Sequence, residues 1–522
     1  MLTIQLRSTR LQRRRPVGGK VVPPCDILEQ GEGIQTAAEP SAGFYSKTQT
    51  AETPAGPISR GEGGRHEEAS QAWRHSAWFP ACEPLEVRHQ RRLKLDLRQL
   101  LPHAAGACIL MMGFTMGCTP PDLEVTPAYV FEAPSEALEC RGVRVPSTVD
   151  LQKSLDRHDA GTTFCVSGAH RVTTQIEPQD GQRLVGQDGA VFDGSQPLTK
   201  WHEGAGIWVV RSQSQGPTVN HEGSFPDFLH EEARYSDDVF YDGALLERVN
   251  SKKELGSGHF YFDYDKDHIY IADSPIGHTV ELAVADGIVG GEASRVAVKN
   301  LTVQKSLGRG VTAGSGWSVT GSEIRLNATT GMKLGDNGTA RHNFLHHNGQ
   351  YGLTGAGDNI VVEENEISFN NSHRYYNAIG RNWASGGTKF VLTGSPSEPG
   401  SGLVLRDNYS HENWGDGLWT DINNIHTLIE GNTVTNNERY GIRHEISYDA
   451  TIRNNTVSEN TAAGIVINSS PNVEVYGNNV WRNGDGIEVL DQDRGTGPYG
   501  PYVTEGLDLH DNEIVSNLEA SS

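Results

Sequence analysis

The chain has 522 residues, including 60 glycines, and a formal net charge of −22 at pH 7. The acidic excess lies after residue 100, where 55 Asp and Glu stand against 29 Lys and Arg. A protein this acidic repels a phosphate backbone, so its composition excludes nucleic acid as a partner and leaves neutral, cationic or metal-bridged ligands open.

Residues 1–86 are rich in Gly, Pro, Arg and Glu and show no periodicity. This composition is typical of a disordered leader. We expect either such a leader or an over-extended translation start, with the true start near Val87.

Residues 87–118 have the features of an export signal. A basic segment, Arg91-Arg92-Leu93-Lys94, precedes the apolar run Leu100–Gly117, which ends at Cys118. The tail Thr115-Met116-Gly117-Cys118 resembles a lipobox, whose cysteine is lipidated after cleavage. A lone transmembrane anchor or a buried helix is the alternative. We therefore expect an exported protein, extracellular or held in the cell envelope by lipid on Cys118, with no other membrane contact.

Residues 119–200 are expected to form an N-terminal cap and the first rungs of a solenoid. Residues 147–158 predict a short helix, and residues 161–165 begin a series of short β-type runs. Cys140 and Cys165 flank the start of this region and are predicted to form a disulfide in an oxidising compartment. Two buried free thiols are the alternative.

Residues 201–285 interrupt this pattern. Alternating apolar residues in 258–264 and 268–272 predict two strands joined by an Asp-Lys-Asp turn. We expect a small β-rich insertion that either walls a groove or packs against the solenoid.

Residues 286–522 contain repeats in which an asparagine is followed five residues later by a second asparagine and then by a glycine-led strand. The first asparagines are 22 to 24 residues apart, apart from two longer gaps, and are Asn343, Asn365, Asn408, Asn432, Asn455, Asn478 and Asn512. Such a period with short β runs predicts an all-β fold, a right-handed parallel β-helix. Asparagine tolerates tight turns and stacks as an amide ladder, so these residues are expected to be structural.

Two phrases carry a family resemblance. Residues 417–424 (GLWTDINN) and 444–450 (HEISYDA) resemble bacterial right-handed parallel β-helix repeat proteins of the pectin-lyase-like superfamily, which includes β-helical glycoside hydrolases. The resemblance covers roughly residues 138–517 and implies the fold and the handling of polysaccharide.

Aligning the repeats on Gly387, Gly417, Gly441 and Gly464 predicts which side chains share a column. With a period of two, the third and fifth residues of each strand point outward. One column then contains Lys389, Trp419, Arg443 and Val466, and its neighbour contains Val391, Asp421, Glu445 and Asn468. Adjacent rungs are about 4.8 Å apart, so Asp421 and Glu445 should be direct neighbours on the solvent face.

This arrangement suits carbohydrate chemistry. Asp421 and Glu445 are the candidate catalytic acid and base or nucleophile, and retaining and inverting geometries are both open. Trp419 is expected to stack on a sugar ring, while Lys389 and Arg443 either tune the pKa values of the carboxylates or hold a substrate oxygen. The structural alternative is that both carboxylates form ion pairs with Lys389 and Arg443, or bind a structural cation.

Three further groups are candidates for the site. His444 is expected to point inward as a core residue, unless the strand end turns it toward the substrate. Tyr376 and Trp383 lie in the insertion 371–385 and either wall the substrate or pack within the loop. Glu488, Asp491 and Asp493, one rung later, extend the site or bind calcium; the chemistry itself requires no cofactor.

Three functions follow, and a monomer is expected for each. The first is a glycoside hydrolase acting on a polysaccharide or oligosaccharide. The second is a polysaccharide lyase or uronate epimerase that uses Lys389, Arg443 and His444. The third is a non-catalytic carbohydrate-binding or adhesin solenoid.

Overall fold

The computed structural model describes residues 6–8, 127, 129–131, 139–187, 189–213, 234–375, 385–515 and 517. All of them belong to one compact unit that comprises residues 1–13 and 120–522. Of the expected leader, only β1 (Leu6–Ser8) is described, as a parallel strand beside β40 (Asp485–Asp491). The export segment 87–118, with Cys118, lies outside the described residues.

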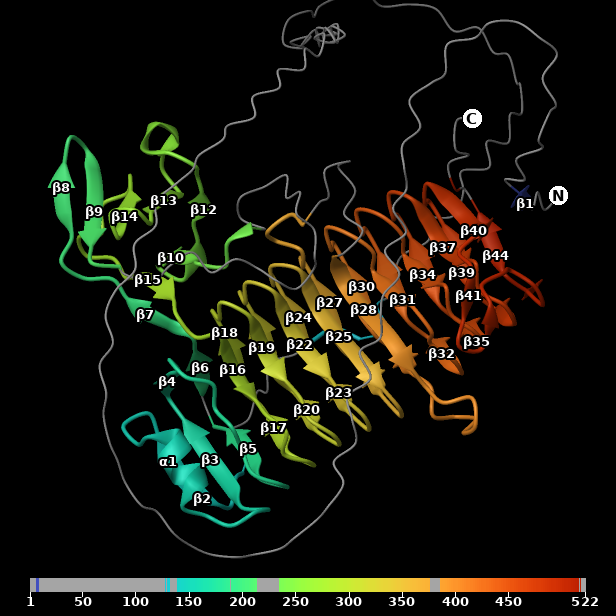
Figure 1. Ribbon diagram of the computed structural model, residues 1–522, viewed down its shortest axis with the longest axis horizontal. Helices are drawn as coiled ribbons and strands as arrows, with labels where there is room; N and C mark the ends of the chain where they lie inside the picture. The colour runs from blue at the N-terminus through green and yellow to red at the C-terminus, as the bar shows by residue number, and fades with distance from the viewer. Residues whose placement is uncertain are drawn as a thin grey trace, which may run out of the picture. The chain divides into compact units, whose positions relative to one another are not determined.

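Most of the described chain forms a stack of rungs that contribute strands to three parallel sheets (Figure 1). Beside β40, sheet A contains β16 (Gly287–Gly290), β19 (Arg309–Thr312), β22 (Thr330–Leu334), β25 (Tyr351–Gly357), β28 (Gly386–Thr393), β31 (Leu418–Asp421), β34 (Ile442–Glu445) and β37 (Ala463–Asn468).

Sheet B contains β2 (Val143–Pro146), β3 (Thr163–Ser167), β5 (Arg183–Gly186), β17 (Ala297–Lys299), β20 (Ser318–Thr320), β23 (Thr339–Arg341), β26 (Val361–Glu363), β29 (Val404–Arg406), β32 (Thr427–Glu430), β35 (Ala450–Arg453), β38 (Val473–Tyr476) and β43 (Asp508–His510). Sheet C contains β4 (Ala169–Arg171), β6 (Val191–Asp193), β18 (Thr302–Gln304), β21 (Glu323–Arg325), β24 (Phe344–His346), β27 (Glu366–Ser368), β30 (Tyr409–His411), β33 (Thr433–Thr435), β36 (Thr456–Ser458), β39 (Asn479–Trp481) and β44 (Glu513–Val515). The predicted β-helix is confirmed.

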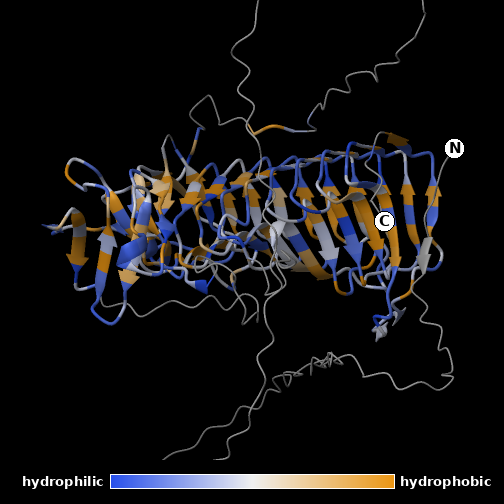
Figure 2. Cartoon of the chain, turned by 90° about the horizontal axis from the view of Figure 1, so that it is seen from above, coloured by the Kyte–Doolittle hydropathy of each residue, from blue (hydrophilic) through white to orange (hydrophobic). Residues whose placement is uncertain are grey.

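Apolar columns fill the space between the three sheets. Leu418, Ile442 and Ile465 follow one another in register on β31, β34 and β37, and all three are fully buried. Hydrophobic residues gather in the strands and hydrophilic ones at the turns (Figure 2). Burying apolar surface contributes about 25 cal/mol per Å², so rung-on-rung stacking supplies the main stabilisation of the solenoid.

The repeated asparagines form hydrogen-bonded ladders. Asn432 Nδ2 donates to Asn455 Oδ1 at 2.9 Å, and Asn455 Nδ2 donates to Asn478 Oδ1 at 2.9 Å. A second ladder links Asn437 Nδ2 to Asn460 Oδ1 at 3.0 Å. The structural role predicted for these residues is confirmed, because each ladder satisfies buried amides at the turns.

The N-terminal end of the solenoid carries a short cap. Helix α1 (Leu151–Asp156) begins after Asp150, whose side chain accepts a hydrogen bond from the backbone N–H of Lys153. A disulfide joins Cys140 to Cys165 of β3, with the Cα atoms 5.7 Å apart. The bond ties the chain before the cap to the second strand of sheet B.

The interrupting segment forms two small sheets with their own apolar core. Their elements are β7 (Ser195–Pro197), β8 (His202–Gly204), β9 (Ile207–Arg211), β10 (Val239–Tyr241), β11 (Ala244–Leu245), β12 (Glu247–Arg248), β13 (His259–Asp263), β14 (His268–Ile271) and β15 (Val280–Ala283), with the 3-10 helix η1 (Lys252–Glu254). Asp238 meets His373 of the solenoid at 3.1 Å, with both side chains buried. This insertion therefore packs against the solenoid.

Candidate functional site

Glycine leads the strands of sheet A because the asparagine ladder lies against it. A Cβ on Gly417 would lie 2.7 Å from Asn437 Nδ2 and 2.6 Å from Val434 Cγ1. Gly441 meets Asn460 Nδ2 in the same way, at 2.8 Å. The ladder and the glycines thus set the register of the strands that follow.

That register places the two candidate carboxylates side by side. Asp421 of β31 pairs with Glu445 of β34, and Trp419 pairs with Arg443. Glu445 in turn pairs with Asn468 of β37. These columns are the ones that the glycine alignment predicts.

The outward face of these strands is covered, which corrects the expectation of a solvent face. Asp421 is 5% exposed and Glu445 is 3% exposed. A charged group at this depth is costly unless it is paired. The environment of both carboxylates is therefore dominated by their partners.

Each carboxylate has a cation. Lys389 Nζ lies 2.8 Å from Asp421 Oδ2, and Arg443 Nη2 lies 2.6 Å from Glu445 Oε2. Glu445 Oε1 also accepts hydrogen bonds from Asn468 Nδ2 at 2.8 Å and Arg494 Nη1 at 3.0 Å. The ion pairs named as the structural alternative are thus present, and both oxygens of Glu445 are engaged.

Asp421 differs from Glu445 in one respect. Its Oδ1 is buried and has no hydrogen-bond partner among the described residues. A buried acceptor without a partner costs about 1–3 kcal/mol, and native structures contain few of them. Among the four carboxylate oxygens of the pair, this atom is the one without a partner in the described residues.

A third carboxylate, which sequence reasoning missed, lies at the other end of the same strands. Asp416 is fully buried and contacts Arg443 Nη1 at 3.3 Å and Arg439 Nε at 3.7 Å. Burial lowers the pKa of Arg443, but Asp416, Glu445 and Asp421 outweigh it and raise that pKa above its ordinary value. Arg443 therefore remains charged and links Asp416 to Glu445.

Trp419 does not offer a surface to a sugar in this structure. The residue is 1% exposed, and the ring centroid lies 3.8 Å from Lys389 Nζ and 4.6 Å from Arg443 Cζ. These cations come from the strands on either side, so cation–π contacts occupy the ring. Trp419 is expected from the sequence to stack on a sugar ring; instead, its ring is buried between the side chains of Lys389 and Arg443.

His444 is a core residue, as its inward register predicts. It is fully buried, and its Nδ1 lies 2.8 Å from Thr420 Oγ1. Burial lowers its pKa to about 3, so the ring is neutral at physiological pH. The ring faces the interior, so this structure does not show the strand-end turn that would present His444 to a substrate.

Two insertions lie near the site in the sequence, one at residues 371–385 and one after β40, and the structure describes the first only in part. Tyr376 and Trp383 lie outside the described residues. The insertion after β40 is described and contains the hairpin β41 (Thr496–Gly497) and β42 (Gly500–Pro501). Tyr448 donates a hydrogen bond to the Gly500 carbonyl at 2.9 Å, and Arg494 reaches Glu445. Nothing in the repeat pattern indicates this contact, since Arg494 lies outside the repeats.

Asp491 and Asp493, proposed to extend the site or bind calcium, are exposed. Within the described residues, neither these two nor Glu488 belongs to a group of three metal-ligating side chains. The one such group among the described residues consists of Glu474, Asp508 and His510.

The chain is a right-handed parallel β-helix protein. The family model "Right handed beta helix region" matches residues 369–500, which include the strands of the candidate site. No curated protein matches the chain.

Solved structures share the fold at low identity. The complex of XylC with xylose is 14% identical, with a TM-score of 0.56 over 71% of this chain and 85% of that one. A glycoside hydrolase is 8% identical, with a TM-score of 0.50 over 71% and 96% of the two chains. The A-module of the Azotobacter vinelandii mannuronan C-5 epimerase AlgE6 is 14% identical, with a TM-score of 0.39 over 70% and 80%. At these identities, the similarity to the first two structures concerns the fold alone.

Proposed function

We propose that this protein is a carbohydrate-active enzyme, a glycoside hydrolase that cleaves a polysaccharide or oligosaccharide with Asp421 and Glu445. The observation that carries the proposal is the in-register pairing of two buried carboxylates, one of which keeps an unpartnered oxygen. Adjacent strands are about 4.8 Å apart, a spacing compatible with the paired carboxyl groups of glycosidases.

The contacts of the two carboxylates support different roles. Asp421 is held through Oδ2 by Lys389 and presents Oδ1, which suits a nucleophile or base. Glu445 is the second carboxyl group, and Arg494 on the hairpin segment covers its Oε1. Because both carboxylates are buried, substrate entry requires displacement of the side chains that cover them; Arg494, which contacts Glu445, is 38% exposed.

The fold comparison is consistent with this chemistry. Two solved structures with a TM-score of at least 0.5 are a complex of XylC with xylose and a glycoside hydrolase. Carbohydrate chemistry in this chain is part of the proposal, and its assignment to hydrolysis rests on Asp421 and Glu445.

The lyase or epimerase alternative has less support. It needs Lys389, Arg443 or His444 to remove a proton or to neutralise the acid of the substrate. Lys389 and Arg443 are paired with carboxylates, and His444 faces the core. The binding-only alternative loses its main platform, because Trp419 is buried.

We also propose that the protein is exported and acts as a monomer, either extracellular or anchored by lipid on Cys118. The Cys140–Cys165 disulfide supports an oxidising compartment. Within the part of the chain that the structure describes, no helix is long and apolar enough to cross a membrane.

A polysaccharide and oligosaccharide digest screen tests the function. The intact protein is compared with Asp421→Asn, Glu445→Gln and the control Glu430→Gln, which alters a paired carboxylate on sheet B. The proposal predicts reducing sugar from the parent and the control only. Ultraviolet-absorbing unsaturated ends, or binding without any product, would contradict it.

A further inference from the structure

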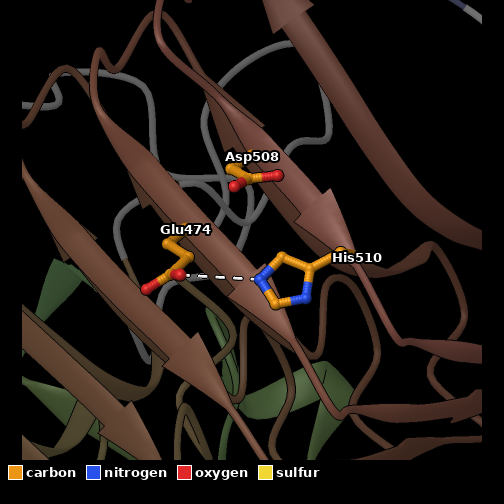
Figure 3. A group of neighbouring side chains, drawn as sticks. All are labelled: Glu474, Asp508 and His510. Carbon is orange, nitrogen blue, oxygen red and sulfur yellow. Dashed lines mark hydrogen bonds and ion pairs between the residues drawn. The ribbon is translucent and has the colours of Figure 1, made fainter.

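The last rungs of sheet B bring together three side chains with metal-ligand chemistry. Glu474 of β38 pairs in register with Asp508 of β43, and Tyr476 pairs with His510. Asp508 and His510 are two residues apart on one strand, so they share a face. One donor atom from each of Glu474, Asp508 and His510 lies within 4.8 Å of the others, and Figure 3 shows the three side chains on neighbouring strands, with a dashed line between Glu474 and His510.

The charge pattern here differs from the rungs before it. In one column of sheet B, Arg406 Nε contacts Glu430 at 3.3 Å and Arg453 Nη2 contacts Glu430 at 2.7 Å, so opposite charges alternate there before the column continues to Tyr476 and His510. In the neighbouring column, the uncharged Leu428 and Thr451 are followed by Glu474 and Asp508, two carboxylates directly opposite each other. Among the described residues, no lysine or arginine pairs with either, although like charges at this spacing are destabilising.

The histidine is held as metal-bound histidines are held. His510 Nδ1 lies 3.0 Å from Asp511 Oδ2, and the ring stacks on Tyr476 with the centroids 4.9 Å apart and the planes at 7°. The Tyr476 hydroxyl accepts a hydrogen bond from Arg453 Nη1 at 2.9 Å. This leaves Nε2 facing Glu474 Oε1 at 3.5 Å, the limit for a hydrogen bond. A carboxylate on the far nitrogen of a ligating histidine is the usual second layer of a metal site.

We propose that Glu474, Asp508 and His510 bind one divalent cation of the zinc class. One imidazole nitrogen with two carboxylate oxygens is a donor set that Zn²⁺ accepts, whereas Ca²⁺ and Mg²⁺ favour oxygen alone. Three protein ligands leave a fourth position to water.

The cation would clamp the end of the solenoid. It joins β38 to β43 across residues 477–507, the stretch that contains the hairpin and Arg494. A cross-link that closes a long segment stabilises the folded state by restricting the unfolded chain. The site is independent of the catalytic proposal, because it lies on sheet B and the paired carboxylates lie on sheet A.

Metal titration of the chelator-treated, untagged full-length protein tests the site. Zn²⁺ binding is measured by calorimetry and Co²⁺ binding by visible absorption, for the parent, His510→Ala, Asp508→Asn and Asp511→Asn. The control is His278→Ala, which removes an exposed histidine that is paired with Asp242 at 2.6 Å and has no third ligand among the described residues. Circular dichroism and thermal melting confirm that each variant is folded.

We expect one equivalent of Zn²⁺ and Co²⁺ to bind the parent and the control, and this binding to be lost in His510→Ala and Asp508→Asn. Asp511→Asn should weaken it about tenfold, because it removes only the orienting carboxylate. Zinc should also raise the melting temperature of the parent but not of His510→Ala. Absence of binding, binding unchanged in His510→Ala, or Ca²⁺ binding as tight as Zn²⁺ binding would overturn the proposal.

Discussion

The ammonium of Lys389 lies 2.8 Å from Asp421 Oδ2 and 3.8 Å from the centre of the Trp419 ring. One side chain thus neutralises a candidate catalytic carboxylate and covers the aromatic residue beside it. Because Asp421 Oδ1 stays unpartnered among the described residues, the contact orients the carboxylate without occupying both of its oxygens.

Lys389→Met tests how far this contact supports the fold. Both side chains are mostly buried, at 19% and 8% exposure, so removal of the cation leaves an uncompensated carboxylate and should cost about 3 kcal/mol in the free energy of unfolding. Chemical denaturation measures this loss. The double variant Lys389→Met with Asp421→Asn should recover most of it, whereas a cost below about 1 kcal/mol would mean that solvent reaches the pair.

Gly417→Ala tests the origin of the strand register. The added Cβ meets Asn437 Nδ2, Val434 Cγ1 and the Gly441 carbonyl at 2.6–2.8 Å. Overpacking of this kind should destabilise the protein by about 2 kcal/mol. Gly204→Ala is the control, because a Cβ there meets nothing within 4 Å. Equal melting temperatures for the two variants would refute the steric role of the leading glycine.

His444 predicts a pH dependence of stability. Its pKa falls from 6.5 to about 3 on burial, so the unfolded chain binds a proton below pH 6.5 that the folded chain does not bind. Stability should therefore be lost as the pH falls from 6.5 toward 3, by up to about 1.4 kcal/mol for each pH unit.

Denaturation curves of the parent and His444→Gln at pH 7, 6 and 5 isolate this contribution. The parent should lose more stability on acidification than the variant, while the exposed control His278→Gln should follow the parent. Parallel pH profiles for the parent and His444→Gln would show that the ring is not buried in its neutral form.

Sequence periodicity was sufficient for the fold and for the columns of the site. The asparagine spacing determines the rung length, and the leading glycine determines the register, so the pairing of Asp421 with Glu445 follows from local patterns. The inward position of His444 follows from the same period of two.

Burial and distant partners could not be predicted in this way. Trp419 is covered by cations of both neighbouring strands, and their conformations depend on side-chain packing rather than on spacing. Arg494 reaches Glu445 from 49 residues further along the chain, and no repeat aligns the two. Asp416 directly precedes Gly417, and the repeat alignment begins at that glycine, so it does not assign Asp416 to either outward column.

The most direct test of the central claim is the rate of glycosidic hydrolysis by Asp421→Asn and Glu445→Gln relative to the parent. The substrate is the one identified in the digest screen, and the melting temperature of each variant is recorded alongside. We expect a folded protein and a loss of about 1,000-fold or more in kcat for each variant, with Glu430→Gln unchanged. Folded variants that retain the parent rate would contradict the assignment of these carboxylates as the catalytic pair.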